Sequence, residues 1–251
     1  MIYICLPVHD EAQTVGVLLW KIRNVMAEFG RDYEVLVLDD GSTDDTGETL
    51  DRYGSSVPLT VLRPGTRLGY AASVERLLRE VVRRAAYPKR DAAVVLQGDF
   101  TEDPADIVAL IKTLEGGADI VAGQEVVDGG APPRRVRWTR ALARLVLGKA
   151  LRGAPVSDPL CGFRAYRVIV LKKALREGAE PMATASERWA ANLELLGALV
   201  PHARRLEEAP LSLRYGLQTR PSRFKALRTL RDLRRVGRSP LLWTGAPGSA
   251  S

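Results

Sequence analysis

Four short apolar segments of the chain each end abruptly in polar residues. They span residues 2–6, 35–38, 59–62 and 92–96, and a fifth spans residues 119–121. Apolar runs of this length, without polar alternation, are typical of parallel strands that are buried on both faces. The pattern therefore predicts five strands, each followed by a polar loop.

Helical periodicity occurs between these strands, over residues 14–29, 70–86 and 104–115. Pro104 stands at the start of the third segment, where its fixed backbone angle suits the first turn of a helix. Residues 43–45 offer capping side chains for a further helix after the second strand. Strands that alternate with helices predict an α/β fold, with a mostly parallel sheet flanked by helices on both faces.

The loops after three of the strands carry the candidate chemistry. The first strand runs into Pro7-Val8-His9-Asp10-Glu11, the second into Asp39-Asp40-Gly41-Ser42 and the fourth into Gln97-Gly98-Asp99. The carboxyl ends of parallel strands meet at one edge of the sheet, where α/β proteins bind ligands, so we expect a site there. Taken alone, the paired aspartates would fit turn and helix-capping roles equally well.

In this order, the three loops resemble those of the inverting family 2 glycosyltransferases, which have the GT-A (Rossmann-like) fold and join a nucleotide sugar to an acceptor. Within that family the chain looks most like the dolichyl- and polyprenyl-phosphate sugar transferases. Later matches are Asp158-Pro159-Leu160-Cys161-Gly162-Phe163-Arg164 and a helix that contains Glu194-Leu195-Leu196. The resemblance extends over residues 1–223 and depends on the order of the motifs, since each is weak alone.

The resemblance implies a Mg²⁺ or Mn²⁺ cofactor, held mainly by Asp99 and also by Gln97. Gln97 departs from the family pattern, because it stands where the DxD element usually has its first aspartate. His9 and Asp10 also depart from the tyrosine and asparagine that are common in the first loop. Hard cations prefer charged oxygen ligands, so the amide weakens the expected metal site. An ordinary amide at a strand end is the alternative for Gln97.

The resemblance also implies a donor site in the first half of the chain. Asp39 and Glu11 would accept hydrogen bonds from the base or ribose, and Pro7 would shape the first loop. Gly69 and Gly98 would allow close approach of the backbone. The other donor-binding candidates are His9, Asp40, Arg67, Gln97 and Asp99.

The expected acceptor site lies in the second half. Asp158 would act near the acceptor either as a base or as a positioning group. A phosphate acceptor favours positioning, because a phosphate monoester with a second pKa of about 6 is already largely ionised at neutral pH. The catalytic candidates are Asp99, Asp158, Arg134, Arg137 and Arg140, and the acceptor- and phosphate-binding candidates are Arg164, Arg214, Ser222 and Arg223.

Charge divides the chain into an acidic and a basic half. Residues 1–130 hold 13 Lys and Arg and 22 Asp and Glu, a net −9, whereas residues 131–251 hold 24 and 8, a net +16. The basic half must face anions such as phosphates or a membrane surface. The predicted organisation is a GT-A domain over 1–221, with a nucleotide-sugar-binding half (1–130) and an acceptor-binding half (131–221), followed by a basic amphipathic helix and a flexible tail over 222–251.

Two clusters hold much of the basic charge. Residues 131–152 contain seven basic residues and no acidic one, and residues 220–238 place an apolar residue at every third position among arginines. The second cluster predicts a basic amphipathic helix suited to an anionic membrane surface. The alternative is a terminal helix docked on the core with solvated arginines. A nucleic-acid partner is not expected, because the clusters contain only Trp138 and Phe224 as aromatic residues and no known binding module.

Other features of the sequence bear on location. No segment approaches the roughly 20 uninterrupted apolar residues of a membrane-spanning helix. The first residues are better read as a strand than as a signal peptide, because they lack a basic region. Cys5 and Cys161 have no metal-ligand spacing and are expected to be reduced thiols. We therefore expect a cytoplasmic enzyme that is peripheral at the inner face of a membrane.

The leading functional hypothesis is transfer of a sugar from a GDP- or UDP-sugar to a polyprenyl or dolichyl phosphate, with inversion and with a divalent metal. One alternative is a related transferase that acts on a soluble or polysaccharide acceptor, with the arginines serving only the donor. A second alternative, favoured by Gln97, is a catalytically weak nucleotide-sugar-binding protein. The sugar, the base and the oligomeric state are left open by the sequence.

Overall fold

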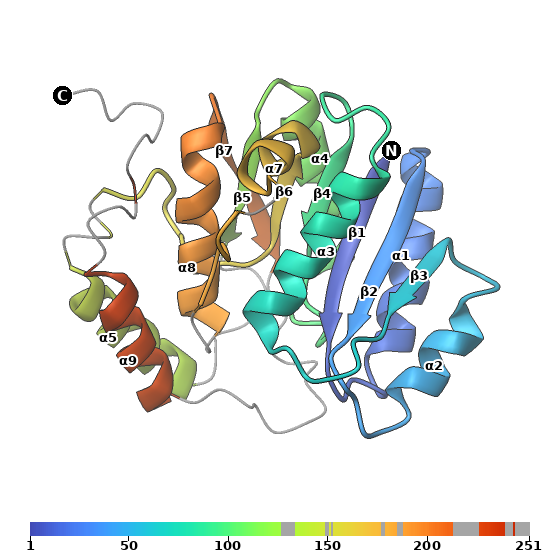
Figure 1. Ribbon diagram of the computed structural model, residues 1–251, viewed down its shortest axis with the longest axis horizontal. Helices are drawn as coiled ribbons and strands as arrows, with labels where there is room; N and C mark the ends of the chain where they lie inside the picture. Colours follow the sequence, from blue (N-terminus) through green and yellow to red (C-terminus); the bar gives the residue numbers. More distant parts are fainter. Residues whose placement is uncertain are drawn as a thin grey trace.

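The fold is that of a computed structural model, which describes residues 1–126, 134–148, 151, 153–176, 179–184, 188–212, 226–238 and 243. A seven-stranded sheet in the order β3-β2-β1-β4-β6-β5-β7 forms its centre (Figure 1). Every neighbouring pair is parallel except the two pairs that include β6. The strands are β1 Ile2–Val8, β2 Tyr33–Asp39, β3 Leu59–Leu62, β4 Ala92–Val95, β5 Ile120–Val126, β6 Arg164–Arg167 and β7 Leu206–Ser212.

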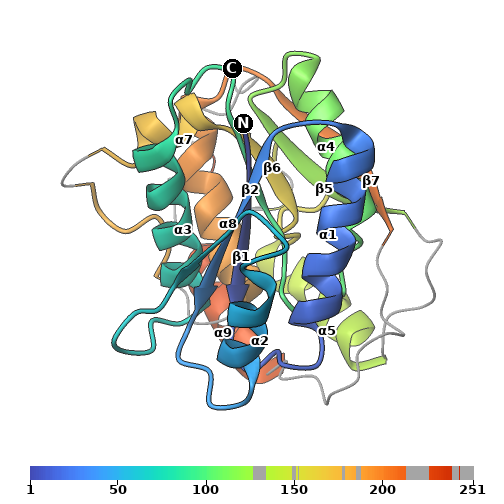
Figure 2. The same cartoon turned by 90° about the vertical axis from the view of Figure 1, so that its right-hand side faces the viewer.

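Helices cover both faces of this sheet (Figures 1 and 2). One face packs against α1 (Val15–Phe29), α2 (Thr46–Tyr53) and α4 (Ile107–Glu115). The other packs against α3 (Tyr70–Arg84), α7 (Val168–Ala174) and α8 (Arg188–Leu199). Short 3₁₀ turns precede α4 and follow α8, at Pro104–Asp106 and Val200–His202. The predicted α/β architecture is confirmed.

Strand β1 shows why the strands read as continuous apolar runs. Ile2, Ile4 and Leu6 join the core on the α1 side of the sheet. Tyr3 and Cys5 join the core on the α3 side. Successive side chains of a strand point to opposite faces, and here both faces are buried, so no polar alternation remains. Both cysteines are free and buried, as expected of reduced thiols.

Two strands, β6 and β7, escaped prediction from the sequence. Strand β6 reads Arg-Ala-Tyr-Arg and β7 contains two glutamates, so neither is an apolar run. Arg164 is nevertheless buried, and Arg167 donates hydrogen bonds to the carbonyl oxygens of Leu114 and Ala118. Antiparallel β6 lies between β4 and β5, and β7 lies beside β5, so both halves of the chain contribute to one sheet.

The basic segment near the C-terminus forms helix α9 (Ala226–Val236), which packs against α5 (Arg134–Leu147) and α8 (Figure 1). Its apolar side is not exposed, because Leu233 and Val236 are buried and Leu230 packs against the same core. The docked-helix alternative therefore describes α9. Leu227 is the exception, with 86% of its surface exposed. Phe224 and the predicted flexible tail, apart from Trp243, lie outside the described residues.

Across the described ranges, no helix has both the length and the apolar character needed to cross a bilayer.

Two leucines of α9 provide a test of this docking. Leu233→Ala should lower the free energy of unfolding by about 2–5 kcal/mol, because a buried leucine is lost and a cavity remains. Leu227→Ala is the matched control on the same helix and should change it by no more than about 0.5 kcal/mol. Denaturant unfolding of both variants measures the difference. Equal effects of the two substitutions would show that α9 does not dock through Leu233.

Candidate functional site

The site lies where the strand order reverses. Strand β1 pairs with β2 on one side and with β4 on the other, and all three run parallel. The connecting helices α1 and α3 pack on opposite faces of the sheet (Figure 2). Such a switch point opens a crevice at the carboxyl ends of the strands, and three of the predicted loops follow β1, β2 and β4.

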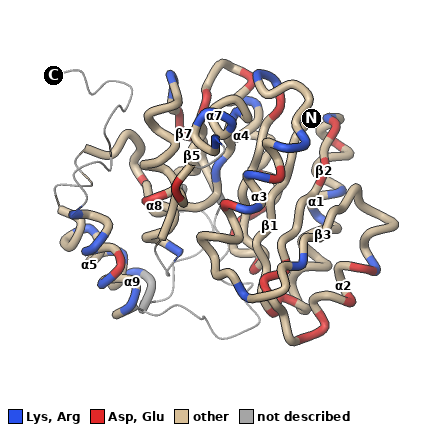
Figure 3. Tube along the Cα trace, in the orientation of Figure 1, with Lys and Arg blue, Asp and Glu red and all other residues tan. Residues whose placement is uncertain are grey.

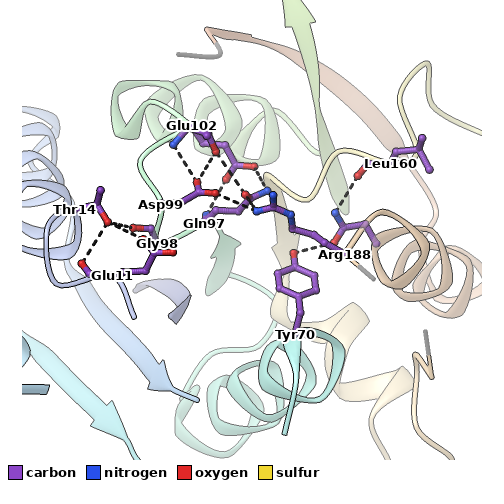
Figure 4. Close-up of polar contacts among 11 residues, drawn as sticks. Glu11, Thr14, Tyr70, Gln97, Gly98, Asp99, Glu102, Leu160 and Arg188 are labelled. Atoms are coloured by element: carbon purple, nitrogen blue, oxygen red, sulfur yellow. Dashed lines mark hydrogen bonds and ion pairs between the residues drawn. The ribbon is translucent and has the colours of Figure 1, made fainter. Parts of the chain in front are cut away.

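The loops after β1 and β4 are joined directly (Figure 4). Thr14 Oγ1 lies 3.0 Å from Glu11 Oε2 and 3.1 Å from the carbonyl oxygen of Gly98. A Cβ atom on Gly98 would lie 2.6 Å from Val8 Cγ1 and 3.4 Å from the carbonyl oxygen of Pro7. The backbone at Gly98 therefore lies close to the end of β1. The close approach predicted for this glycine occurs between the ends of β4 and β1.

The loops after β1 and β2 are also joined. Asp10 has a positive φ of 50°, and its Oδ1 accepts a hydrogen bond from Thr43 N at 2.7 Å. The backbone N–H of Asp10 donates to Ser42 Oγ, and that of Glu11 donates to Thr46 Oγ1. His9 Nε2 lies 3.3 Å from Asp10 Oδ2. The departure from the family pattern at position 10 thus supplies a carboxylate that fastens the second loop.

Asp39 and Asp40 differ in what they bind. Both Asp40 oxygens accept from backbone N–H groups, Oδ1 from Leu68 at 2.5 Å and Oδ2 from Gly69 at 2.8 Å. Asp39 Oδ1 accepts from Ser42 N at 3.0 Å, while its Oδ2 has no hydrogen-bonding partner among the residues that the structure describes. Asp40 therefore holds the loop before α3, and Asp39 retains an oxygen that can accept from a ligand.

The loop before α3 brings Arg67 to the same edge. Arg67 Nε lies 3.9 Å from Asp40 Oδ2, and most of its side chain is exposed. Gly69 caps the N-terminus of α3 with a positive φ of 84°, a conformation that a side chain would strain. The glycine is thus required by the turn into α3. The exposed side chain of Arg67 lies beside the crevice, where it can change conformation.

Residues from the loop after β4 and from α8 form a polar cluster (Figure 4). Arg188, in the first turn of α8, places its NH1 against Gln97 Oε1 and 3.3 Å from Asp99 Oδ2. Asp99 Oδ1 also accepts from the backbone N–H and the hydroxyl of Thr101, at 3.1 and 2.6 Å. A guanidinium therefore lies between the two side chains for which a metal was predicted.

Glu102 completes this cluster through two contacts with Gln97. Its two oxygens accept from the backbone N–H of Gln97 at 2.8 Å and from Gln97 Nε2 at 3.1 Å. Burial raises the pKa of Glu102 to about 8, and the nearby charge of Asp99 acts in the same direction against the lowering effect of the Gln97 hydrogen bonds. The side chain is therefore mainly protonated at neutral pH. An amide at position 97 can donate to Glu102, which a carboxylate there could not do.

Asp158 pairs with Arg140, which comes from α5. Arg140 NH2 lies 2.6 Å from Asp158 Oδ2, and Asp158 Oδ1 accepts from Leu160 N at 3.1 Å. The Arg140 guanidinium lies 5.9 Å from the ring centre of Trp189, which directly follows Arg188. The Arg140–Asp158 pair is thus adjacent to the polar cluster. Asp158 binds Arg140 and also stabilises the turn that follows Asp158 in the chain.

Arg164 lies in the protein interior and mainly supports the fold. It is buried, and its NH1 and NH2 donate to the carbonyl oxygens of Asn192 and Pro159 at 2.7 and 2.6 Å. Asn192 in turn accepts from the hydroxyl of Tyr70 at 2.9 Å and donates to the carbonyl oxygen of Leu160 at 2.9 Å. These bonds join α3, α8 and the loop before β6. Phosphate binding by Arg164 remains a prediction.

The other predicted arginines are placed only in part. Arg137 is exposed on α5. Arg134 begins α5, but its side chain lies outside the described part of the structure. Arg214, Ser222 and Arg223 fall in a segment that is likewise outside it. Sequence reasoning missed Arg188 and Glu102, because neither belongs to a motif and only the fold brings α8 to the end of β4.

The donor atoms of the cluster do not fit a divalent cation in this arrangement. Gln97 Oε1 and Asp99 Oδ2 face the Arg188 guanidinium, and Asp99 Oδ1 faces the two donors of Thr101. Mg²⁺ needs about six oxygen ligands at roughly 2.0–2.1 Å, usually including ionised carboxylates. Among the described residues, no group of three or more His, Cys, Asp or Glu side chains could hold a metal. Metal ligation by Asp99 and Gln97 would therefore require Arg188 to move, and it stays a prediction.

Comparison with known sequences identifies relatives of this chain. The family model described as glycosyl transferase family 2 matches residues 3–175. A dolichol-phosphate mannosyltransferase of Pyrococcus furiosus is 27% identical over 181 residues, 70% of this chain and 47% of that protein. An undecaprenyl-phosphate 4-deoxy-4-formamido-L-arabinose transferase of Edwardsiella ictaluri is 27% identical over 178 residues, 68% of this chain and 50% of that protein. The chain spans about half the length of these relatives.

Solved structures share the fold. Glucosyl-3-phosphoglycerate synthase from Mycobacterium tuberculosis, in complex with phosphoglyceric acid, matches with a TM-score of 0.61 and 20% identity, over 99% of this chain and 81% of that one. The same enzyme with Mn²⁺, uridine-diphosphate-glucose and phosphoglyceric acid gives a TM-score of 0.60 and 17% identity, over 99% and 81%. At these identities the likeness concerns the fold alone.

Substitution of the two neighbouring aspartates should separate ligand binding from loop support. Asp39→Ala should weaken binding of UDP or GDP by about 1–3 kcal/mol, the usual cost of removing a hydrogen-bonding partner. Asp40→Ala should instead lower the free energy of unfolding by about 1–3 kcal/mol, because two backbone donors lose their acceptor. Calorimetry and denaturant unfolding measure the two effects. Unchanged nucleotide affinity of Asp39→Ala would reduce Asp39 to a turn residue.

Proposed function

Because this chain belongs to glycosyl transferase family 2, we propose that it transfers a sugar from a nucleoside diphosphate donor to the phosphate of a polyprenyl or dolichyl lipid, with inversion at the sugar. The names of the two relatives described above support a lipid phosphate as acceptor. The observation that carries the proposal is that acidic loops from three parallel strands meet at one edge of the sheet, where Arg188 of α8 contacts Gln97 and Asp99.

In this proposal the donor base and ribose lie along the loops after β1 and β2. Asp39 Oδ2 and the carboxylate of Glu11 accept hydrogen bonds from them, and Arg67 reaches the nucleotide from the loop before α3. The bonds of Asp10, Thr14 and Asp40 fix these loops relative to one another before the donor binds. A binding surface that is already ordered loses less conformational freedom when the ligand arrives.

The chemical step is a displacement at the anomeric carbon. An oxygen of the acceptor phosphate forms the new bond to that carbon, and the bond to the nucleoside diphosphate breaks with its electron pair on the departing oxygen. The acceptor phosphate is already largely ionised, so no base is required. Asp158 therefore positions Arg140, whose guanidinium binds the acceptor phosphate together with Arg137.

We propose that the protein meets the membrane through the outer face of α5. Trp138, Leu142, Leu145 and Val146 share one side of this helix and are all exposed, with Trp138 at 68% and Leu145 at 78%. Such a row of large apolar side chains on a helix surface suits the interface between lipid headgroups and acyl chains. Leu227 of α9, on the helix packed beside α5, adds to it.

The basic residues around this face of α5 favour binding to an anionic membrane surface. Arg137 and Arg144 are exposed on α5, and Arg228, Arg231, Arg234 and Arg235 are exposed on α9. Figure 3 shows the basic residues of α5 and α9 side by side, away from the acidic residues at the ends of β1 and β2 and on α2. Basic side chains near an anionic bilayer contribute about 1 kcal/mol each. The proposed location is peripheral, at the cytoplasmic face, with the crevice near the lipid phosphate.

Transfer can be tested with purified protein, radiolabelled UDP- and GDP-sugars and a short-chain polyprenyl phosphate. We expect a lipid-linked sugar from at least one donor, and little hydrolysis without acceptor. Arg140→Met should reduce transfer by at least about tenfold, because a charge-assisted bond to the acceptor is lost. Arg31→Met, at the opposite edge of the sheet, is the control. Transfer to a soluble sugar but not to the lipid would favour the alternative acceptor class, and absence of any turnover would favour a binding protein.

Vesicle binding tests the membrane face. The triple variant Trp138→Ser, Leu142→Ser and Leu145→Ser should bind phosphatidylglycerol vesicles more weakly than the parent at both low and high salt, because apolar burial does not depend on salt. Replacing Arg228, Arg231 and Arg235 with glutamine should weaken binding mainly at low salt. Co-sedimentation measures both. Unchanged binding of the triple variant would rule out α5 as the membrane face.

A further inference from the structure

Arg188 brings a positive charge to the loop that follows β4. Its guanidinium lies between Gln97 Oε1 and Asp99 Oδ2, at the carboxyl end of β4 (Figure 4). A nucleoside diphosphate that leaves a sugar gains negative charge, and transfer is faster when fixed positive charge lies beside it. A bound divalent cation supplies such charge in many enzymes, but the residues around Arg188 are arranged to hold a guanidinium.

We propose that the guanidinium of Arg188 binds the donor diphosphate in this chain and that donor binding requires no divalent cation. This role presupposes the nucleotide-sugar donor proposed above. Three features of the cluster support it.

The first feature is the neutral amide of Gln97. Its oxygen accepts from Arg188, and its Nε2 donates to Glu102 Oε1 at 3.1 Å. A carboxylate at position 97 would leave Glu102 without this donor and would add a third acidic side chain next to Asp99. A neutral amide at position 97 therefore suits a cluster that contains a single positive charge, that of the Arg188 guanidinium.

The second feature is that, among the described residues, only one nitrogen of the Arg188 guanidinium has hydrogen-bonding partners. NH1 contacts Gln97 and Asp99, whereas Nε and NH2 have no hydrogen-bonding partner among the residues described. The side chain is 36% exposed. A guanidinium that is fixed at one nitrogen and open at the others can donate two parallel hydrogen bonds to phosphate oxygens.

The third feature is the position of Arg188 in the fold. It lies in the first turn of α8, and α8 is held against α3 and the loop before β6 by Asn192, which bonds Tyr70 and the carbonyl oxygen of Leu160. The next residue, Trp189, lies against Arg140, the proposed acceptor-binding arginine. Arg188 is thus fixed between the donor loops and the acceptor side, which is where the diphosphate must lie.

Calorimetry with UDP and GDP tests this assignment. The parent protein should bind at least one of them with the same dissociation constant, within about twofold, in excess EDTA and in Mn²⁺. Arg188→Met should weaken binding by about 10- to 100-fold in both conditions, the range for hydrogen bonds to charged groups. Arg188→Lys should be intermediate, because it keeps the charge and loses the fork. Arg31→Met, which removes an arginine paired with Glu115 at the far edge, should bind like the parent.

The outcomes separate this assignment from the proposed function. Binding that disappears in EDTA and returns with Mn²⁺ would overturn the role of Arg188 and leave the transferase proposal standing. An unchanged affinity of a folded Arg188→Met variant for UDP or GDP would also overturn the role of Arg188. Binding of neither nucleotide to the parent in any condition would overturn the nucleotide-sugar site, and the role of Arg188 with it.

A direct measurement of metal binding gives a second readout. The paramagnetic signal of free Mn²⁺ should be no lower with parent protein and nucleotide together than with nucleotide alone. Depletion of this signal by the parent, abolished by Asp99→Ala, would show a metal site at this cluster and contradict the assignment.

Discussion

The contact of Arg188 with Gln97 and Asp99 joins the two halves of the molecule. The donor loops come from the acidic first part of the sequence, whereas Arg188 begins a helix far along the chain. The carboxylate of Asp99 and the partial charge of the Gln97 oxygen would be poorly compensated in the crevice without a cation nearby. One guanidinium provides that cation and at the same time orders the entrance to the site.

A second constraint is the tight joining of the three loops at the strand ends. Asp10, Thr14 and Asp40 accept or donate bonds that run between loops, so that the crevice keeps its shape without a ligand. Gly98 permits this by letting the end of β4 lie against β1. The polar residues that look like ligand-binding residues in the sequence thus divide into two groups. Some shape the site, and others, such as Asp39, retain atoms that a ligand can use.

The sequence alone predicted the core of the sheet, because buried parallel strands have a continuous apolar pattern, and it indicated the carboxyl edge as the candidate site. It could not predict β6, whose two arginines donate to backbone carbonyls, or β7, whose glutamates interrupt the pattern. It also missed Arg188 and Glu102, since their proximity to Gln97 depends on how α8 packs. The amphipathic pattern near the C-terminus predicted a helix suited to a membrane surface, whereas the apolar side of α9 packs on the protein. Periodicity shows that a helix has an apolar side and does not show what covers it.

In the proposed role of Arg188, a guanidinium anchored by Asp99 and Gln97 binds the donor diphosphate. A crystal structure of the protein with UDP or GDP, grown in chelator, tests it most directly. Phosphate oxygens should lie within hydrogen-bonding distance of Arg188, with Gln97 Oε1 still accepting from its NH1. In crystals then soaked in Mn²⁺, an anomalous signal from an ion bound to Asp99 and the diphosphate, with Arg188 displaced, would contradict it.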